Sequence, residues 1–136
     1  MAGSTAPGRR HSDVFFWTLR ILLASLFLYQ GIDKFSDRRL WLRLFEEIGF
    51  GQWFRYFTGV VEISGALMLL VPRATLVGVG LLVCTMIGAL LVHAFVMGLG
   101  PQTVFVAVLL ALLCGIGVRH ISRKKLKEGQ ALVASL

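Results

Sequence analysis

Residues 52–70 read QWFRYFTGVVEISGALMLL, an apolar stretch with one acid, Glu62, near its middle. At ~1.5 Å of rise per residue, a helix over this stretch would cross the hydrocarbon core of a bilayer, which is ~30 Å thick. A charged side chain at the centre of a bilayer costs roughly 2.5 to 3.5 kcal/mol on insertion scales. An acid without a purpose would be replaced easily at this position, so we predict that Glu62 is a functional residue.

The composition of the chain is that of an integral membrane protein. Hydrophobic residues make up 57% of the 136 residues and charged residues 15%, which is too apolar for a water-soluble domain of this size. The length leaves room for about four spans with tight connections and none for a separate soluble catalytic domain. The net charge of +7 comes from Lys and Arg beside apolar runs. We therefore expect the lipid bilayer as a partner, with anionic headgroups facing these cations, and no nucleic acid.

The apolar runs predict an all-α fold, an antiparallel four-helix bundle in one transmembrane domain over residues 13–118. Turns as short as Pro72-Arg73 and the segment 98–101 force successive spans to be antiparallel neighbours. The spans are expected at about 14–32, 52–71, 74–97 and 102–118. A disordered basic leader, 1–12, is expected before them and a basic cytoplasmic tail, 119–136, after them.

The connection between the first two spans predicts a short amphipathic helix at about 37–48. Its apolar residues recur at helical spacing among charges, as expected for a helix that lies in the membrane interface over the mouth of the bundle. These residues are Leu40, Trp41, Leu44, Phe45 and Ile48. Ser36 is expected to cap the start of this helix and Gly49 to suit its end.

Small residues recur every four positions in the last two predicted spans. They are Gly80, Cys84 and Gly88 in the third span and Ala107, Ala111 and Gly115 in the fourth. This spacing lets transmembrane backbones approach closely, so we expect the two spans to pack through these residues. Cys84 and Cys114 form no CxxC motif and have no neighbouring His, so neither a disulfide nor a metal site is predicted.

The Lys and Arg residues on the two sides of the spans predict the orientation of the chain. Eight of them fall on the side of both termini and five on the other side, with Arg20 inside a span and counted on neither. Loops rich in Lys and Arg remain in the cytoplasm. We therefore expect both termini to be cytoplasmic.

Depth in the membrane brings two polar residues together. Arg20 lies about 10 Å from the cytoplasmic start of the first span, and Glu62 lies near mid-depth in the second. An Arg side chain can reach across this difference, so we predict an ion pair between Arg20 and Glu62. The pair can carry a ligand or a proton, or it can serve only to hold the helices in register.

Other polar residues are expected near the outer mouth of the bundle. Arg55 shares a helix face with Glu62, and His93 should lie level with Gln30, Asp33 and Lys34. This arrangement predicts a polar vestibule above the buried acid. A single His is more often a hydrogen-bonding interface residue than a ligand of iron, and no metal or haem is predicted.

A family resemblance is carried by Arg20, Gln30-Gly31-x-x-Lys34-Phe35, Ile48-Gly49-Phe50, Gly59-x-x-Glu62-x-x-Gly65-Ala66-x-x-Leu69-Leu70 and His93. Together these residues resemble the DoxX-like family of small bacterial membrane proteins, over about residues 14–118. Ala66 stands where many relatives have a second glycine. The resemblance implies a four-helix bundle in the bacterial inner membrane. Named relatives occur as a subunit of a thiosulfate:quinone oxidoreductase and in membrane complexes linked to redox and thiol stress.

Two functions are supported as hypotheses. In the first, the chain is the membrane subunit of a quinone-linked or thiol-stress oxidoreductase and is not active alone. Glu62 and His93 would then contact a proton or the ligand, and a quinone would be held by Arg20, Gln30, Lys34 and Arg55. In the second, it is a non-catalytic membrane scaffold or assembly factor. A small-molecule transporter subunit is a weaker alternative, and a protein partner or a homo-oligomer is expected in each case.

Overall fold

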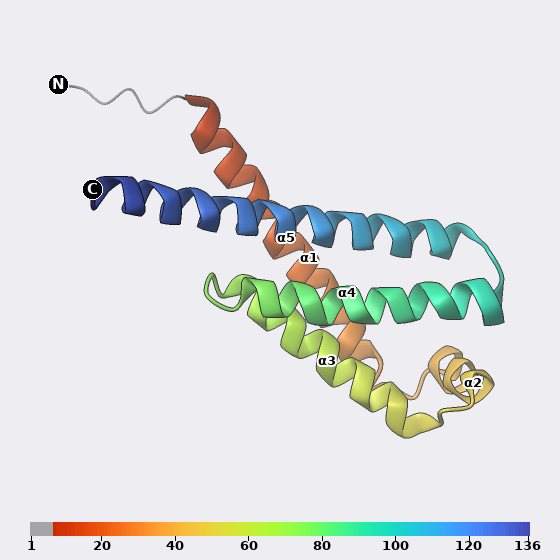
Figure 1. Cartoon of the computed structure of the whole chain (residues 1–136). Helices are drawn as coiled ribbons and strands as arrows, with labels where there is room; N and C mark the ends of the chain where they lie inside the picture. Colours follow the sequence, from red (N-terminus) through yellow and green to blue (C-terminus); the bar gives the residue numbers. More distant parts are fainter. Residues whose placement is uncertain (1–6) are drawn as a thin grey trace.

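The computed structural model of the protein describes residues 7–136, and these residues form helices and connections with no strand among them. The all-α class is therefore confirmed for this part of the chain. The elements in order are α1 (Pro7–Asp33), α2 (Arg39–Ile48), α3 (Gln52–Leu70), α4 (Thr75–Val92), the π-helical turn η1 (His93–Met97) and α5 (Pro101–Ala134) (Figure 1).

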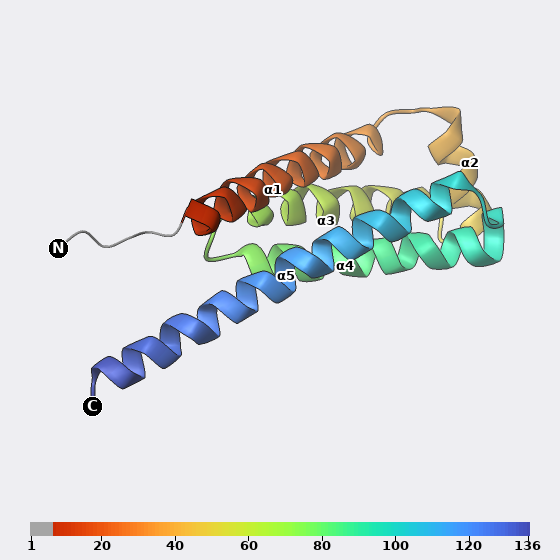
Figure 2. The ribbon, with the colours of Figure 1, turned by 90° about the horizontal axis from the view of Figure 1, so that it is seen from above.

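Each long helix packs on the next one along the chain. Helix α1 packs on α3, α3 on α4, and α4 on α5, while α2 lies against the beginning of α3. Both views show α4 and α5 side by side, joined by the connection at 98–100 (Figures 1 and 2). The loop between α1 and α2 lies next to the first turns of α3, where Arg55 donates to the carbonyl oxygen of Ser36.

The core lies where the four long helices meet. Its buried side chains are Leu23, Ala24, Phe27, Ala66, Leu69, Val79, Leu82, Met86, Val106, Leu109, Leu113 and Ile116. Large apolar side chains also cover the outside of every long helix, including Leu22, Val60, Ile87 and Val108. Water-soluble proteins rarely expose apolar surface on this scale, whereas a protein surrounded by lipid requires it. The fold is that of a helical membrane protein.

Within the described residues, three helices are both long and apolar enough to cross a membrane. They are His11–Asp33, Thr75–Met97 and Pro101–Ala134. The second of these combines α4 and η1. Helix α3 has 19 residues, enough to reach across a bilayer. It is not among the three because Arg55 and Glu62 lower its hydropathy. A fourth span formed by α3 remains a prediction, which reporter fusions can test.

Pairs of glycines let the helices approach until their backbones touch. A Cβ atom built on Gly59 of α3 would lie 3.0 Å from the carbonyl oxygen of Gly31 in α1. A Cβ atom built on Gly78 of α4 would lie 2.8 Å from the carbonyl oxygen of Gly65 in α3. Such distances leave no room for a side chain, so these glycines determine how closely α3 packs between its two neighbours.

The expectation that α4 and α5 pack through their small residues is wrong. A Cβ atom built on Gly80, Gly88 or Gly115 would meet open space, and Cys84 is exposed. The contact between the two helices uses larger aliphatic side chains of the core instead. A four-residue spacing places residues on one helix face, but it does not determine whether that face is buried.

The first and last helices extend beyond the predicted spans. Helix α1 includes residues 7–12, part of the stretch predicted to be disordered, and residues 1–6 lie outside the described part. Helix α5 continues through the basic tail to Ala134. Once an apolar span has formed a helix, each further residue adds a hydrogen bond without a new nucleation cost, so a helix extends readily into polar sequence.

Helix α2 begins at Arg39, two residues later than expected, and ends at Ile48. Capping by Ser36 is wrong, because its hydroxyl donates to the carbonyl oxygen of Asp33 at 2.6 Å and Arg38 occupies the N-cap position. Gly49 follows the helix with φ of 82°, a left-handed conformation that favours glycine, and its N–H donates to the Glu46 carbonyl oxygen at 3.1 Å.

Candidate functional site

The centre of the candidate site is a buried ion pair between Lys34 and Glu62. Lys34 directly follows the last residue of α1, and its ammonium group donates to Oε2 of Glu62 in the middle of α3. Only 6% of Lys34 and 3% of Glu62 is exposed. Both charges are therefore withdrawn from water and from lipid, and each depends on the other for compensation.

The contact between Gly31 and Gly59 creates this pair. Because neither glycine has a side chain, the end of α1 lies directly on α3, and a Cβ atom on Gly59 would be 3.4 Å from the Cβ of Lys34. Glu62 is one turn further along α3, within reach of the flexible lysine side chain. The Lys34 ammonium also lies 5.2 Å from the centre of the Trp41 ring, a cation–π contact that joins α2 to the site.

The predicted ion pair between Arg20 and Glu62 is wrong. Arg20 donates from Nε and Nη2 to the carbonyl oxygen of Leu69, at 3.0 and 2.5 Å, and from Nη2 to the hydroxyl of Thr75 at 2.6 Å. The last carbonyls of a helix have no partner within the helix, and Leu69 offers such an oxygen at the end of α3. Glu62 lies seven residues earlier, about 10 Å along the helix axis. Arg20 therefore holds α1 to the turn between α3 and α4.

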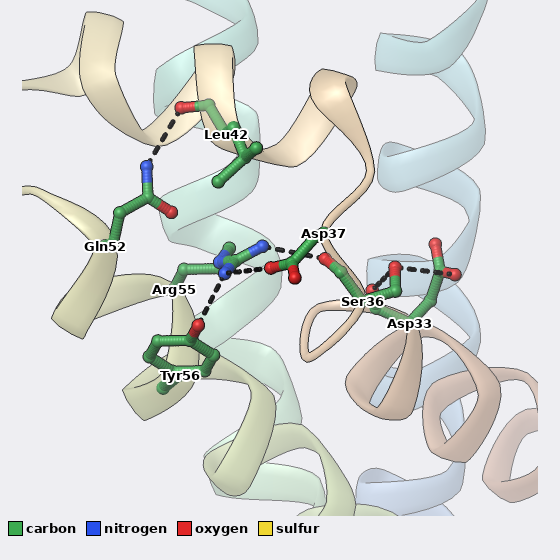
Figure 3. A network of polar contacts seen from close by, with 7 residues as sticks. All are labelled: Asp33, Ser36, Asp37, Leu42, Gln52, Arg55 and Tyr56. Carbon is green, nitrogen blue, oxygen red and sulfur yellow. Dashed lines mark hydrogen bonds and ion pairs between the residues drawn. The ribbon is translucent and has the colours of Figure 1, made fainter.

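Arg55, seven residues before Glu62 on α3, forms a second polar network (Figure 3). Its side chain is 1% exposed, and it donates to the carbonyl oxygen of Ser36 at 2.8 Å and to the hydroxyl of Tyr56 at 2.7 Å. Its Nη2 also lies 3.7 Å from a carboxylate oxygen of the exposed Asp37. Arg55 thus fastens the loop between α1 and α2 to the beginning of α3.

Two buried polar atoms beside this network lack a hydrogen-bond partner in the described part of the chain. They are Nε of Arg55 and Oε1 of Gln52. The amide nitrogen of Gln52 donates to the carbonyl oxygen of Leu42 in α2 at 3.1 Å. Gln52 and Arg55 are three residues apart and share a face of α3, so an unused donor and an unused acceptor lie on the same side of the helix.

The side chains of His93 and Gln30 form no hydrogen bond with Lys34 or Glu62 in the described part of the chain. His93 belongs to η1, is half-buried, and has Nδ1 2.7 Å from the carbonyl oxygen of Ala89 one turn earlier. The backbone oxygen of Gln30 accepts from the N–H of Lys34 at 3.2 Å. Between either residue and Glu62, the described residues show no hydrogen bond or ion pair. Residue spacing placed these groups at a common depth, which does not bring them into contact.

The contacts of Asp33 with Trp41 and Arg38 were not predicted from the sequence, which placed Asp33 only at the depth of His93. Asp33 accepts a hydrogen bond from the Trp41 indole at 2.9 Å and forms an ion pair with Arg38 at 3.1 Å. It thereby fixes the indole whose ring faces Lys34. The neighbouring acid and amine, Asp33-Lys34, at the end of an apolar span are the signal that could have indicated a site at this position.

Exposed aromatic rings border the buried pair. The rings of Phe35 and Tyr56 lie 5.5 Å apart, and these residues are 44% and 39% exposed. A Cβ atom on Gly59 would be 2.9 Å from the Phe35 ring, so the rings and the ion pair meet at the same glycine. An apolar ring compound dissolved in lipid could stack on this surface within one helical turn of Glu62.

The family model described as the DoxX-like family matches residues 18–116, which include the ion pair and both glycine contacts. No curated protein matches the chain significantly. The same is true of solved structures.

Proposed function

The chain belongs to the DoxX-like family of membrane proteins, and from this premise we propose that it is the membrane subunit of a quinone-linked redox complex. The observation that carries the proposal is the buried pair of Lys34 and Glu62 beside the exposed rings of Phe35 and Tyr56. In this arrangement, the membrane subunit receives the ring compound from lipid and a partner protein supplies or removes electrons.

The ion pair suits the proton chemistry of such a compound. A quinone takes up two electrons and two protons when it becomes a quinol, and a buried amine and carboxylate can exchange a proton with its oxygens. Loss of a proton from the pair leaves a single uncompensated charge, which drives rapid return of a proton from water. We propose that His93, the more exposed group, takes part in that return, and that Gln30 and Arg55 line the mouth. Arg20 binds the end of α3, far along the helix from Glu62, and is not proposed as a contact of the ring compound.

A second candidate is a non-catalytic scaffold or assembly factor. It is favoured by the fact that Arg20, Lys34, Arg55 and Glu62 all have partners within the protein, as charges with a purely structural role would. The candidates differ in what the purified protein should carry. Native mass spectrometry should find a bound ring compound in the first case, and a partner protein or a second copy with no small molecule in the second.

A short-chain quinone analogue is expected to raise the melting temperature of the detergent-purified protein by several degrees through preferential binding to the folded state. Phe35→Leu removes one ring of the proposed surface and should abolish the rise. Phe95→Leu is the matched control, since Phe95 is 84% exposed on η1 and its ring contacts no other aromatic ring among the described residues, and it should leave the rise intact. His93→Ala should also leave the rise in melting temperature intact, because His93 is proposed to return protons and not to bind the analogue.

The absence of a shift at saturating analogue, together with a lipid extract that contains no quinone, would favour the scaffold. An equal loss of the shift in Phe35→Leu and Phe95→Leu would also count against the proposed surface, because the analogue would then be partitioning into exposed apolar surface in general.

We further propose that the chain is an antiparallel bundle of four spans in the bacterial inner membrane, with both termini cytoplasmic. The proposal rests on the Lys and Arg bias and on the length of α3. A reporter active only in the periplasm should work when fused after Gly49, and one active only in the cytoplasm should work after Leu136. A cytoplasmic reporter that is active after Gly49 would overturn this topology. A periplasmic reporter that is active after Leu136 as well as after Gly49 would show that α3 does not span, because only two crossings would then separate the two sites.

A further inference from the structure

A cationic cavity lies at the other end of α1, where α1 meets α5. It has a volume of about 70 Å³ and is lined by side chains that include Arg20, Arg119 and Arg123. A single water needs only ~10–15 Å³ of such space, so the cavity accommodates a group several times larger. The cavity is separate from the Lys34–Glu62 site, and its role is independent of the function proposed for that site.

The cavity has more positive than negative charge. Arg119 donates to Oδ1 of Asp13 at 3.0 Å, and Arg123 donates to the same oxygen. The cavity thus holds three guanidinium groups and one carboxylate, which leaves an excess of two positive charges with His120 neutral. Each guanidinium has five N–H donors, and one carboxylate oxygen uses few of them.

Arg20 forms the inner end of the cavity. It is 9% exposed, and its Nη1 has no hydrogen-bond acceptor among the described residues, whereas Nε and Nη2 are occupied by Leu69 and Thr75. Arg20 is seven positions after Asp13 on α1, about 10 Å along the helix axis from the carboxylate that binds Arg119 and Arg123. Donors therefore line the cavity from its mouth to its inner end.

Aromatic rings hold two of the guanidinium groups in place. The Arg119 guanidinium carbon lies 3.8 Å from the centre of the Phe16 ring, and that of Arg20 lies 4.6 Å from the centre of the Trp17 ring. Stacking of this kind reduces the conformational freedom that a long side chain would lose on binding. The rings also give the cavity an apolar wall on the side where α1 faces lipid.

We propose that this cavity binds a phosphate group. Guanidinium groups match the geometry of phosphate oxygens and bind them in pairs, and the excess of two positive charges suits an anion of one or two negative charges. The phosphate can belong to an anionic phospholipid or to a soluble phosphate compound. In a lipid, Arg119 and Arg123 would hold the phosphate at the membrane surface, and Nη1 of Arg20 would reach the ester oxygens below it.

The test uses the full-length protein, purified and delipidated in detergent. Binding is followed by melting temperature and native mass spectrometry with three probes: dioleoylphosphatidylglycerol, dioleoylphosphatidylcholine and inorganic phosphate. We expect phosphatidylglycerol to bind at least tenfold more tightly than phosphatidylcholine, whose headgroup has no net charge. Specific binding of inorganic phosphate at millimolar concentration would instead assign the cavity to a soluble phosphate compound. Binding of neither anion would overturn the proposal.

The double variant Arg119→Gln/Arg123→Gln should weaken binding of the anion at least tenfold through loss of charge-assisted hydrogen bonds. Lys125→Gln/Lys127→Gln on the same helix removes the same charge outside the cavity and should have little effect. Equal loss in both double variants would show a general attraction to basic surface and overturn the proposal.

A gain of affinity provides a check that misfolding cannot imitate. Asp13→Asn removes the carboxylate that competes for Arg119 and Arg123, so the anion should bind more tightly, by threefold or more. Weaker binding to Asp13→Asn would contradict the assignment of these arginines to the anion.

Discussion

Glu62→Gln is expected to lower the free energy of unfolding by ~3–5 kcal/mol, because it leaves the Lys34 ammonium buried without a carboxylate. The effect is large because Glu62 and Lys34 are almost completely withdrawn from solvent and, among the described residues, no other acid is paired with this amine. Chemical unfolding in detergent micelles, with the loss of helix followed by circular dichroism, measures the change.

A double-mutant cycle tests whether the two residues are coupled. Lys34→Met together with Glu62→Gln should cost less than the sum of the single changes, because neither charge is then left alone. Arg20→Gln with Glu62→Gln is the matched comparison and should be additive within ~0.5 kcal/mol, since Arg20 binds the end of α3. Strong coupling of Glu62 to Arg20, with none to Lys34, would contradict the arrangement of the site.

Gly78→Ala is expected to destabilise the protein by ~1–3 kcal/mol, although alanine favours helices more than glycine does. The added Cβ would lie 2.8 Å from Gly65 O and Leu69 N, and 3.0 Å from the carbonyl carbon of Met68. All three atoms belong to the backbone of α3, so no side chain can rotate away and the two helices must separate.

Gly80→Ala provides the matched control for this change. It lies two residues further along α4, and its added Cβ would meet open space. The substitution should be neutral or stabilise by up to ~1 kcal/mol through helix propensity alone. Melting temperatures of both variants in one detergent allow the comparison. Equal effects at the two positions would mean that α3 and α4 do not cross at Gly78.

Stability and ligand binding must be measured separately at the proposed quinone site. Glu62→Gln changes both, because it removes the proton-exchanging acid and also unbalances a buried charge. Phe35→Leu leaves the ion pair and its hydrogen bonds in place, so a change in binding by this variant reports on the exposed rings. This is why the ligand test relies on Phe35 while the test of the ion pair relies on Glu62.

The helical class, the membrane environment and the family follow from the amino-acid sequence alone. Long apolar runs with charges at their ends can satisfy their backbone groups in lipid only as helices or closed barrels, and the runs are long enough for helices. The residues that carry the family resemblance lie within the matched range, 18–116. The amphipathic spacing from Leu40 to Ile48 likewise indicated the short helix that the structure places at α2.

The pairing of the polar groups and the burial of the small residues depend on how the helices pack. Helical rise gives the depth of a residue, but contact also depends on the rotation of each helix about its axis. The glycine contacts set that rotation and bring Lys34 to Glu62. Arg20 instead donates to a carbonyl oxygen at the end of α3. For the same reason, the spacing of Gly80 and Cys84 could not reveal that their face points outward, because periodicity defines a face and packing alone decides what covers it.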